Sequence, residues 1–112
     1  MRDDPEPAPF GVVDVLDRLV HSPARLAILT ALSAHDHADF TYLLRLTGLT
    51  KGNLSANLAK LEAGHLVEID KRIVARKTRT TARLTANGRR AIDAYWQQME
   101  RLRDAARSTT EA

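Results

Sequence analysis

DFTYLLRLTGLTKGNLSANLAKLEAG, residues 39–64 of this 112-residue chain, contains two predicted helices with a glycine between them. Asp39 can cap a short helix that ends at Gly48, because glycine readily adopts the left-handed conformation that closes a helix. Thr50 can cap a second, longer helix over residues 51–63. A short helix, a tight glycine turn and a longer helix are the plan of a helix-turn-helix motif, whose second helix enters the major groove of DNA. We therefore predict a recognition helix at residues 51–63.

The two sides of the predicted helix 51–63 differ in chemistry. Leu54, Leu58 and Leu61 share one side at about 100° per residue, so we expect that side to be buried. The exposed side is small and polar and carries no acid before Glu62, whereas an ordinary solvated helix would carry Glu and Lys there. Small residues let a helix approach base edges, and asparagine can both donate and accept hydrogen bonds. The predicted reading positions are Thr50, Lys51, Gly52, Asn53, Ser55, Ala56, Asn57 and Lys60.

A change of apolar period after this helix predicts a β-hairpin. Val67, Ile69 and the aliphatic stem of Lys71 alternate with Glu68 and Asp70, as expected for a strand with one buried face. A second alternating stretch covers residues 79–84, and residues 73–78 form the turn between the two strands. Residues 71–83 would then be the wing that a winged helix-turn-helix places beside its recognition helix.

Positive charge gathers in and after this hairpin. Residues 71–90 hold eight Lys and Arg and no acid, whereas residues 3–17 hold five acids and no base; the formal net charge is +3. Such a cluster is typical of a surface that binds phosphates. Cations on a hairpin suit contacts with the DNA backbone or the minor groove. The predicted wing contacts are Arg72, Arg76, Lys77 and Arg79.

Two further helices are predicted to join two copies of the chain. Apolar residues between 10 and 20 cover more than one stripe of a helix, so a partner chain should bury one of its sides. A helix over residues 85–107 would be about 35 Å long, longer than this small core can cover, and its apolar stripe includes the only tryptophan. We predict a homodimer seam shared by these helices. Its residues are Val12, Leu16, Leu19, Ile92, Tyr95, Trp96, Met99 and Leu102.

The length of the chain suits a single domain. Ser22 followed by Pro23 marks a helix start, a hydroxyl cap before proline at the first helical position. Residues 1–9 are Pro-rich and predicted to be a flexible arm, residues 10–107 the domain, and residues 108–112 a tail. The predicted fold is mainly α with a small β-hairpin: a winged helix-turn-helix with a long C-terminal dimerisation helix.

Several short stretches also carry a family resemblance. They are DFTYL at 39–43, LTKGNLS at 49–55, LEAG at 61–64, RLT at 83–85 and GR at 88–89. In this order they resemble the winged-helix regulators related to the MarR and ArsR groups, and in particular small stand-alone DNA-binding proteins. The resemblance covers residues 12–100 and implies a dimeric bacterial or archaeal transcription regulator. It implies a backbone role for the wing arginines and recognition roles for Thr50, Lys51, Asn53, Ser55 and Asn57.

A metal-sensing repressor is one alternative. His35 and His37, two residues apart in a polar loop with Asp36, could bind zinc or nickel. The chain has no cysteine, however, and Asp39 is needed as a helix cap, so we predict no metal site and no cofactor.

A protein-interaction module is another alternative, in which a winged helix no longer binds DNA. Such a module should carry acids or large apolar residues on the exposed side of helix 51–63, and this sequence has neither. An enzyme is disfavoured because the chain has no Gly-rich phosphate loop, no nucleophile elbow and no pair of carboxylates flanking a pocket.

The location follows from the ends and the apolar runs. No apolar run approaches the roughly 20 residues that cross a bilayer, and the N-terminus, MRDDP, is acidic rather than basic and apolar like a signal peptide. We predict a cytoplasmic protein that binds double-stranded DNA and no membrane. No pattern indicates a small-molecule effector.

Overall fold

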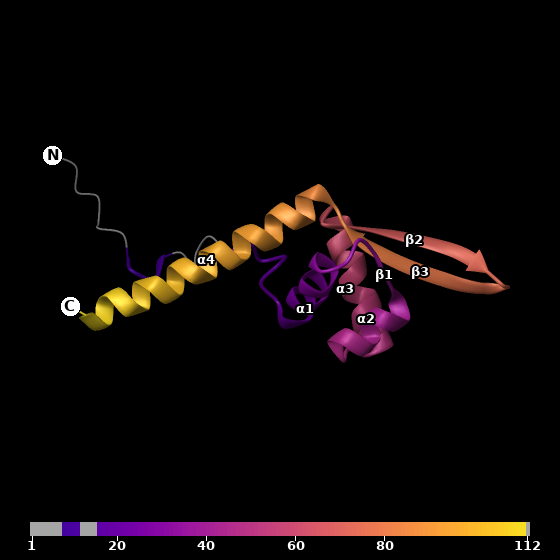
Figure 1. Ribbon diagram of the computed structural model, residues 1–112, viewed down its shortest axis with the longest axis horizontal. Coiled ribbons are helices and arrows are strands. Elements are labelled where there is room, and N and C mark those ends of the chain that lie inside the picture. The colour runs from indigo at the N-terminus through magenta and orange to yellow at the C-terminus, as the bar shows by residue number, and fades with distance from the viewer. Residues whose placement is uncertain (1–7, 12–15, 112) are drawn as a thin grey trace.

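The computed structural model describes residues 8–11 and 16–111. Seven elements follow one another along this part of the chain: α1 Pro23–Ser33, β1 Ala38–Asp39, α2 Phe40–Thr47, α3 Lys51–Ala63, β2 Val67–Val74, β3 Lys77–Leu84 and α4 Ala86–Glu111 (Figure 1). The strands form one antiparallel sheet in the order β1-β3-β2. The predicted class, mainly α with a β-hairpin and a long last helix, is confirmed. Among the described residues, no helix has the length and apolarity to cross a membrane.

The predicted boundaries of α2 and α3 are confirmed by their caps. Asp39 Oδ1 accepts from the backbone N–H of Tyr42 at 2.7 Å, and Thr50 Oγ1 accepts from that of Asn53 at 3.1 Å. Gly48 ends α2 with a φ of 69°, in the left-handed region that favours glycine. Each cap contributes about 1 kcal/mol, and together they fix the angle at which α3 leaves the turn.

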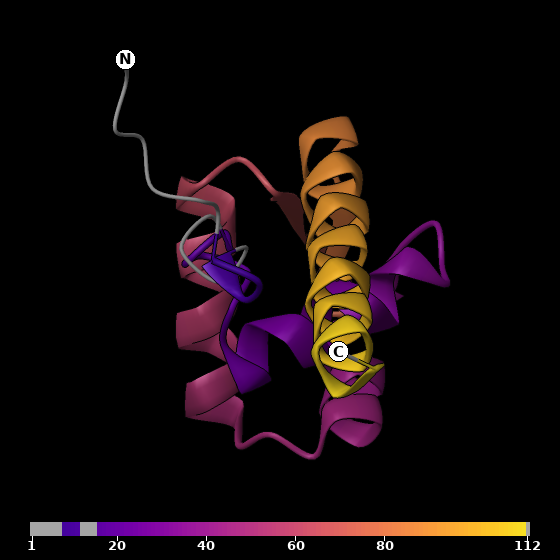
Figure 2. The ribbon, with the colours of Figure 1, turned by 90° about the vertical axis from the view of Figure 1, so that its left-hand side faces the viewer.

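The core lies where α1 and α3 meet the sheet and the start of α4. Its fully buried large side chains are Val20, Ile28, Leu29, Leu32, Leu43, Leu54, Leu61, Val67 and Ile92. Each contributes about 1.5–3 kcal/mol of burial free energy. α1 contacts both α3 and α4, and Figure 2 shows it crossing between them. The C-terminal part of α4 extends beyond the other helices (Figure 1).

The hairpin is longer and its turn tighter than the sequence pattern predicts. β2 and β3 pair without interruption from Val67↔Leu84 to Val74↔Lys77. The turn between them is therefore only two residues long, rather than residues 73–78. β1 was not predicted, because a two-residue strand is too short to show an alternating pattern.

The predicted helix over residues 10–20 is wrong in its second half, while residues 12–15, including Val12, lie outside the described residues. Residues 16–22 form turns and bends. Asp17 explains why: its carboxylate accepts from the backbone N–H of Leu19 at 2.9 Å, and its carbonyl accepts from Val20 and His21. A short acidic side chain that binds nearby N–H groups competes with the helical pattern.

The last helix runs further than predicted. Thr85 Oγ1 accepts from the backbone N–H of Gly88 at 2.9 Å, which confirms the predicted start. α4 continues through residues 108–111, which the sequence had assigned to a tail. Two exposed pairs in its C-terminal half, Glu100 with Arg103 and Asp104 with Arg107, are spaced as helix neighbours and support the helix beyond the core.

Candidate nucleic-acid interface

α3 exposes most of the side that the sequence predicts as a reading face. Leu54, Leu58 and Leu61 are buried as expected. The predicted reading positions that are exposed are Thr50, Lys51, Gly52, Asn53, Ser55, Ala56 and Lys60. A Cβ atom added to Gly52 would have no neighbour within 4 Å, so packing within the chain does not require glycine there. The outer side of α3 is therefore small, polar and open to close approach.

Asn57 departs from the prediction, because its side chain is buried rather than exposed. It is 7% exposed, the one polar residue in the described part of the core. Its Oδ1 accepts from Arg25 Nη1 at 3.1 Å, and its Nδ2 donates to the carbonyl oxygen of Asn53 at 2.9 Å and to the Oδ1 of Asn53. Both ends of the amide are occupied within the chain, so Asn57 no longer counts among the groups that can reach a base. The sequence could not reveal this, since Arg25 lies 32 residues away.

The outer face of the wing carries arginines that already have partners. Arg72 Nε lies 2.6 Å from an Asp70 carboxylate oxygen, and Arg83 Nε donates to Glu68 at 2.9 Å. A third arginine, Arg79, lies 4.0 Å from an Asp39 oxygen. These pairs are exposed, so each contributes about 0–1 kcal/mol and can be exchanged for another anion.

The wing tip carries the cations without such partners. Among the described residues, neither Arg76 nor Lys77 forms an ion pair. Ala75 and Arg76 make the two-residue turn with φ values of 50° and 65°, the backbone of a type I′ hairpin that usually uses Asn or Gly. A left-handed conformation costs roughly 1–2 kcal/mol in such residues. Ile73, two residues before the turn, is 80% exposed. The tip thus presents positive charge and apolar surface together.

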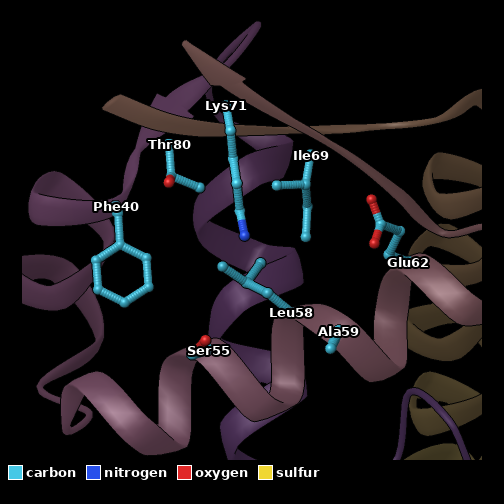
Figure 3. A pocket seen from close by; sticks show the side chains of 8 residues that line it. All are labelled: Phe40, Ser55, Leu58, Ala59, Glu62, Ile69, Lys71 and Thr80. Carbon is cyan, nitrogen blue, oxygen red and sulfur yellow. The ribbon is translucent and has the colours of Figure 1, made fainter. Parts of the chain in front are cut away.

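A groove of about 520 Å³ separates α3 from the inner face of the wing (Figure 3). It is lined by Phe40, Ser55, Leu58, Ala59, Glu62, Ile69, Lys71 and Thr80. Lys71 extends from β2 toward α3 (Figure 3). The alternating pattern of β2 predicts that the aliphatic stem of Lys71 packs on the inward face beside Ile69, so Lys71 is not among the predicted site residues.

The predicted dimer residues separate into two groups. Ile92 and Tyr95 are 1% and 3% exposed, so the core of their own chain covers them and their assignment to a dimer seam is wrong. Tyr95 also forms a 2.9 Å hydrogen bond between its hydroxyl and His21 Nδ1. Trp96 is 45% exposed, and Met99 is half-buried. Leu16, Leu19 and Leu102 are half-buried as well. Of these half-buried residues, Leu16, Leu19 and Met99 pack against the core.

The polar loop before α2 does not gather metal ligands. His35 Nε2 lies 3.4 Å from the Tyr42 hydroxyl, and His37 is exposed. Within residues 8–11 and 16–111, no three His, Cys, Asp or Glu side chains lie close enough to hold a metal ion.

A short helix, a glycine turn, a longer helix with a polar outer side and a hairpin with a basic tip define a winged helix-turn-helix domain. The winged helix DNA-binding domain family matches residues 24–103, and the chain belongs to this family. An uncharacterized protein of Methanocaldococcus jannaschii is 33% identical over 78 residues, which are 70% of this chain and 85% of that protein.

Solved structures agree with this assignment. A transcriptional regulator homologue from Pyrococcus horikoshii OT3 superposes with a TM-score of 0.78 at 24% identity, covering 85% of this chain and 96% of that one. A MarR family regulator from Silicibacter pomeroyi gives 0.63 at 28% identity, over 83% and 62% of the two chains. The protein is a winged-helix transcriptional regulator, and its fold is similar to that of the MarR family regulator. The predicted family is confirmed, and with it the prediction of a regulator rather than an enzyme.

Proposed function

We propose that the protein is a homodimeric transcription regulator that places α3 in the major groove of double-stranded DNA and the wing on the flanking backbone or minor groove. The observation that carries this proposal is the outer side of α3, which is exposed, small and free of acids before Glu62. A protein-interaction surface would instead carry large apolar side chains at its centre.

The proposed contacts divide by chemistry. Neutral groups on α3 read base edges: Thr50, Gly52, Asn53, Ser55 and Ala56. Cations bind phosphates: Lys51 and Lys60 on α3, Arg76 and Lys77 at the wing tip, and Lys71 in the groove. Arg72 and Arg79 rank below the tip residues, because a phosphate would have to replace Asp70 or Asp39 as their partner.

The homodimer is supported by the apolar stripe of α4 where this helix leaves the core. Trp96 is nearly half exposed, and half-buried Met99, which still packs against the core, and half-buried Leu102 follow it at helical spacing. We propose that a second copy covers them, with the domain of residues 10–107 as the dimerising unit and residues 1–9 as an arm. A regulator of this kind works beside the chromosome, in the cytoplasm of a bacterial or archaeal cell.

Selection from a random-sequence duplex library tests the function. The full chain should enrich one sequence, with two similar half-sites if it binds as a dimer. With about four of the five proposed cations on phosphates at once in each subunit, a dimer neutralises about eight phosphates, which predicts a slope near −7 in log affinity against log salt concentration. Failure to bind any duplex at low salt would contradict the proposal and favour the protein-interaction module.

Light scattering tests the homodimer. The wild-type chain should show about twice its 12.4 kDa mass, and Trp96→Asp should shift it toward the monomer because a charge in an apolar seam is costly. The matched control is Gln97→Asp, the same change at the neighbouring exposed position. A monomeric wild type at micromolar concentration would contradict the homodimer.

A further inference from the structure

Arg25 joins the segment before α1 to the recognition helix. Its Nε donates to the carbonyl oxygen of Leu19 at 2.6 Å, and its Nη2 reaches that of Arg18 at 3.4 Å. Its Nη1 donates to Asn57 Oδ1 at 3.1 Å. Leu19 itself packs on the C-terminal end of α3. Its side chain lies so close to Gly64 that a Cβ atom added there would collide with it. Arg25 therefore links the backbone of residues 18 and 19 to Asn57 on α3.

The guanidinium fixes the orientation of the Asn57 amide. A guanidinium can only donate hydrogen bonds, so the oxygen of Asn57 must face Arg25. The Nδ2 group then faces Asn53, where it meets two oxygens, the carbonyl and the side-chain Oδ1. The Asn57 amide is buried and its hydrogen bonds are partly buried, so reversing the amide would leave its Nδ2 facing the donors of Arg25 and its oxygen facing the oxygens of Asn53, at a cost in free energy.

The orientation of the Asn57 amide also fixes that of Asn53, an exposed residue near the N-terminus of α3. Its Oδ1 is directed to Asn57, which leaves its Nδ2 group as the part of the amide that can reach outward. An asparagine that reads adenine uses both ends, accepting from N6 and donating to N7. Asn53 is held so that it offers donors alone.

We infer that Arg25 and Asn57 are positioning residues that make Asn53 a donor-only reader, suited to guanine, whose O6 and N7 both accept. This inference rests on the proposed DNA-binding function and adds the base that Asn53 selects. Asn57 is buried, and the guanidinium of Arg25 donates to Leu19, Arg18 and Asn57, so both residues act on the DNA sequence through Asn53.

The test uses the duplex selected by the wild-type chain. Asn53→Ala first locates the base pair at which discrimination is lost. That pair should be G·C, and replacing its guanine by 7-deazaguanine, which lacks the N7 acceptor, should weaken wild-type binding by about tenfold. An A·T pair at which removal of the adenine amino group weakens binding would overturn the inference, as would an Asn53→Ala variant that loses discrimination nowhere.

Asn57→Asp should reverse the orientation of the Asn53 amide with almost no change in side-chain shape. The carboxylate still accepts from Arg25, but it presents oxygen to Asn53, so the Asn53 amide should turn its Nδ2 inward and its Oδ1 outward. The added negative charge weakens all duplexes alike, so the readout is the ratio of affinities for the guanine and 7-deazaguanine duplexes. We expect this ratio to fall from about ten toward one. An unchanged ratio would overturn the inference.

Arg25→Met provides a second variant if Asn57→Asp unfolds, since it frees the Asn57 amide without adding charge. The same ratio should fall, because the oxygen of Asn57 loses the donor that orients it. If the wild type selects no duplex at all, the proposed function fails and this inference with it. If it selects a duplex but the ratio in Arg25→Met stays at about ten, only this inference fails.

Discussion

The two flanks of α3 are built in opposite ways. On the α1 side, Arg25, Asn57 and Asn53 form a continuous chain of hydrogen bonds that is partly closed to water. On the wing side, α3 faces an open groove that Lys71 enters from β2 (Figure 3). A neutral amide in a fixed orientation can distinguish one base edge from another, whereas a cation at the edge of an open groove attracts phosphates of any DNA sequence. The difference predicts that one flank controls which DNA sequence is bound and the other controls how tightly any DNA is bound.

The largest expected effect comes from removing the charge at the wing tip. Arg76→Ala together with Lys77→Ala removes four cations from a dimer, so the slope of log affinity against log salt should change from about −7 to about −4. Affinity for random and selected duplexes should fall in parallel, measured by fluorescence anisotropy at several salt concentrations. Arg103→Ala with Arg107→Ala removes the same charge from the far part of α4 and should leave the slope nearly unchanged. A parallel fall in the control would mean that net charge, rather than the tip, drives binding.

A smaller effect is expected in the free energy of unfolding when the hydrogen-bonded flank is broken. Arg25→Ala leaves the buried oxygen of Asn57 and the carbonyl of Leu19 without their donor, so stability should fall by about 1–3 kcal/mol. Urea denaturation measures this. Arg18→Ala is the control, because Arg25 uses only the backbone of Arg18, and it should stay within about 0.5 kcal/mol of wild type. Equal losses in the two variants would contradict a specific role for Arg25.

The smallest expected change in the salt slope comes from single substitutions that distinguish the two faces of the wing. Lys71 and Arg72 are consecutive on β2, so their side chains point to opposite faces of the sheet. Lys71→Met should reduce the magnitude of the salt slope by about two for a dimer. Arg72→Met should change it less, since Asp70 already partners that arginine. A larger change for Arg72 would place the DNA backbone on the outer face of the wing.

The order of elements could be predicted from the sequence because it depends on local chemistry. Asp39, Gly48 and Thr50 act on backbone groups within three or four residues of themselves. The burial of Leu54 and its helical neighbours follows from periodicity alone. The same local rules misjudged residues 16–20, where the Asp17 carboxylate competes with a helix that the apolar pattern favours.

The winged-helix plan, the polar outer side of α3 and the basic hairpin could be predicted from the amino-acid sequence, because each depends on residues close together along the chain. Which of these groups are available to a partner depends on how the chain packs in three dimensions. The tertiary structure buries Asn57 against Arg25, covers Ile92 and Tyr95 with their own core, pairs Arg72 with Asp70 and turns Lys71 into the groove. Whether a side chain is available to a partner depends on its neighbours in space. Most of these contacts join residues that are far apart along the chain or whose positions depend on the twist and register of the sheet. The physical reason is that periodicity assigns a side chain to a face, but only packing determines what that face meets.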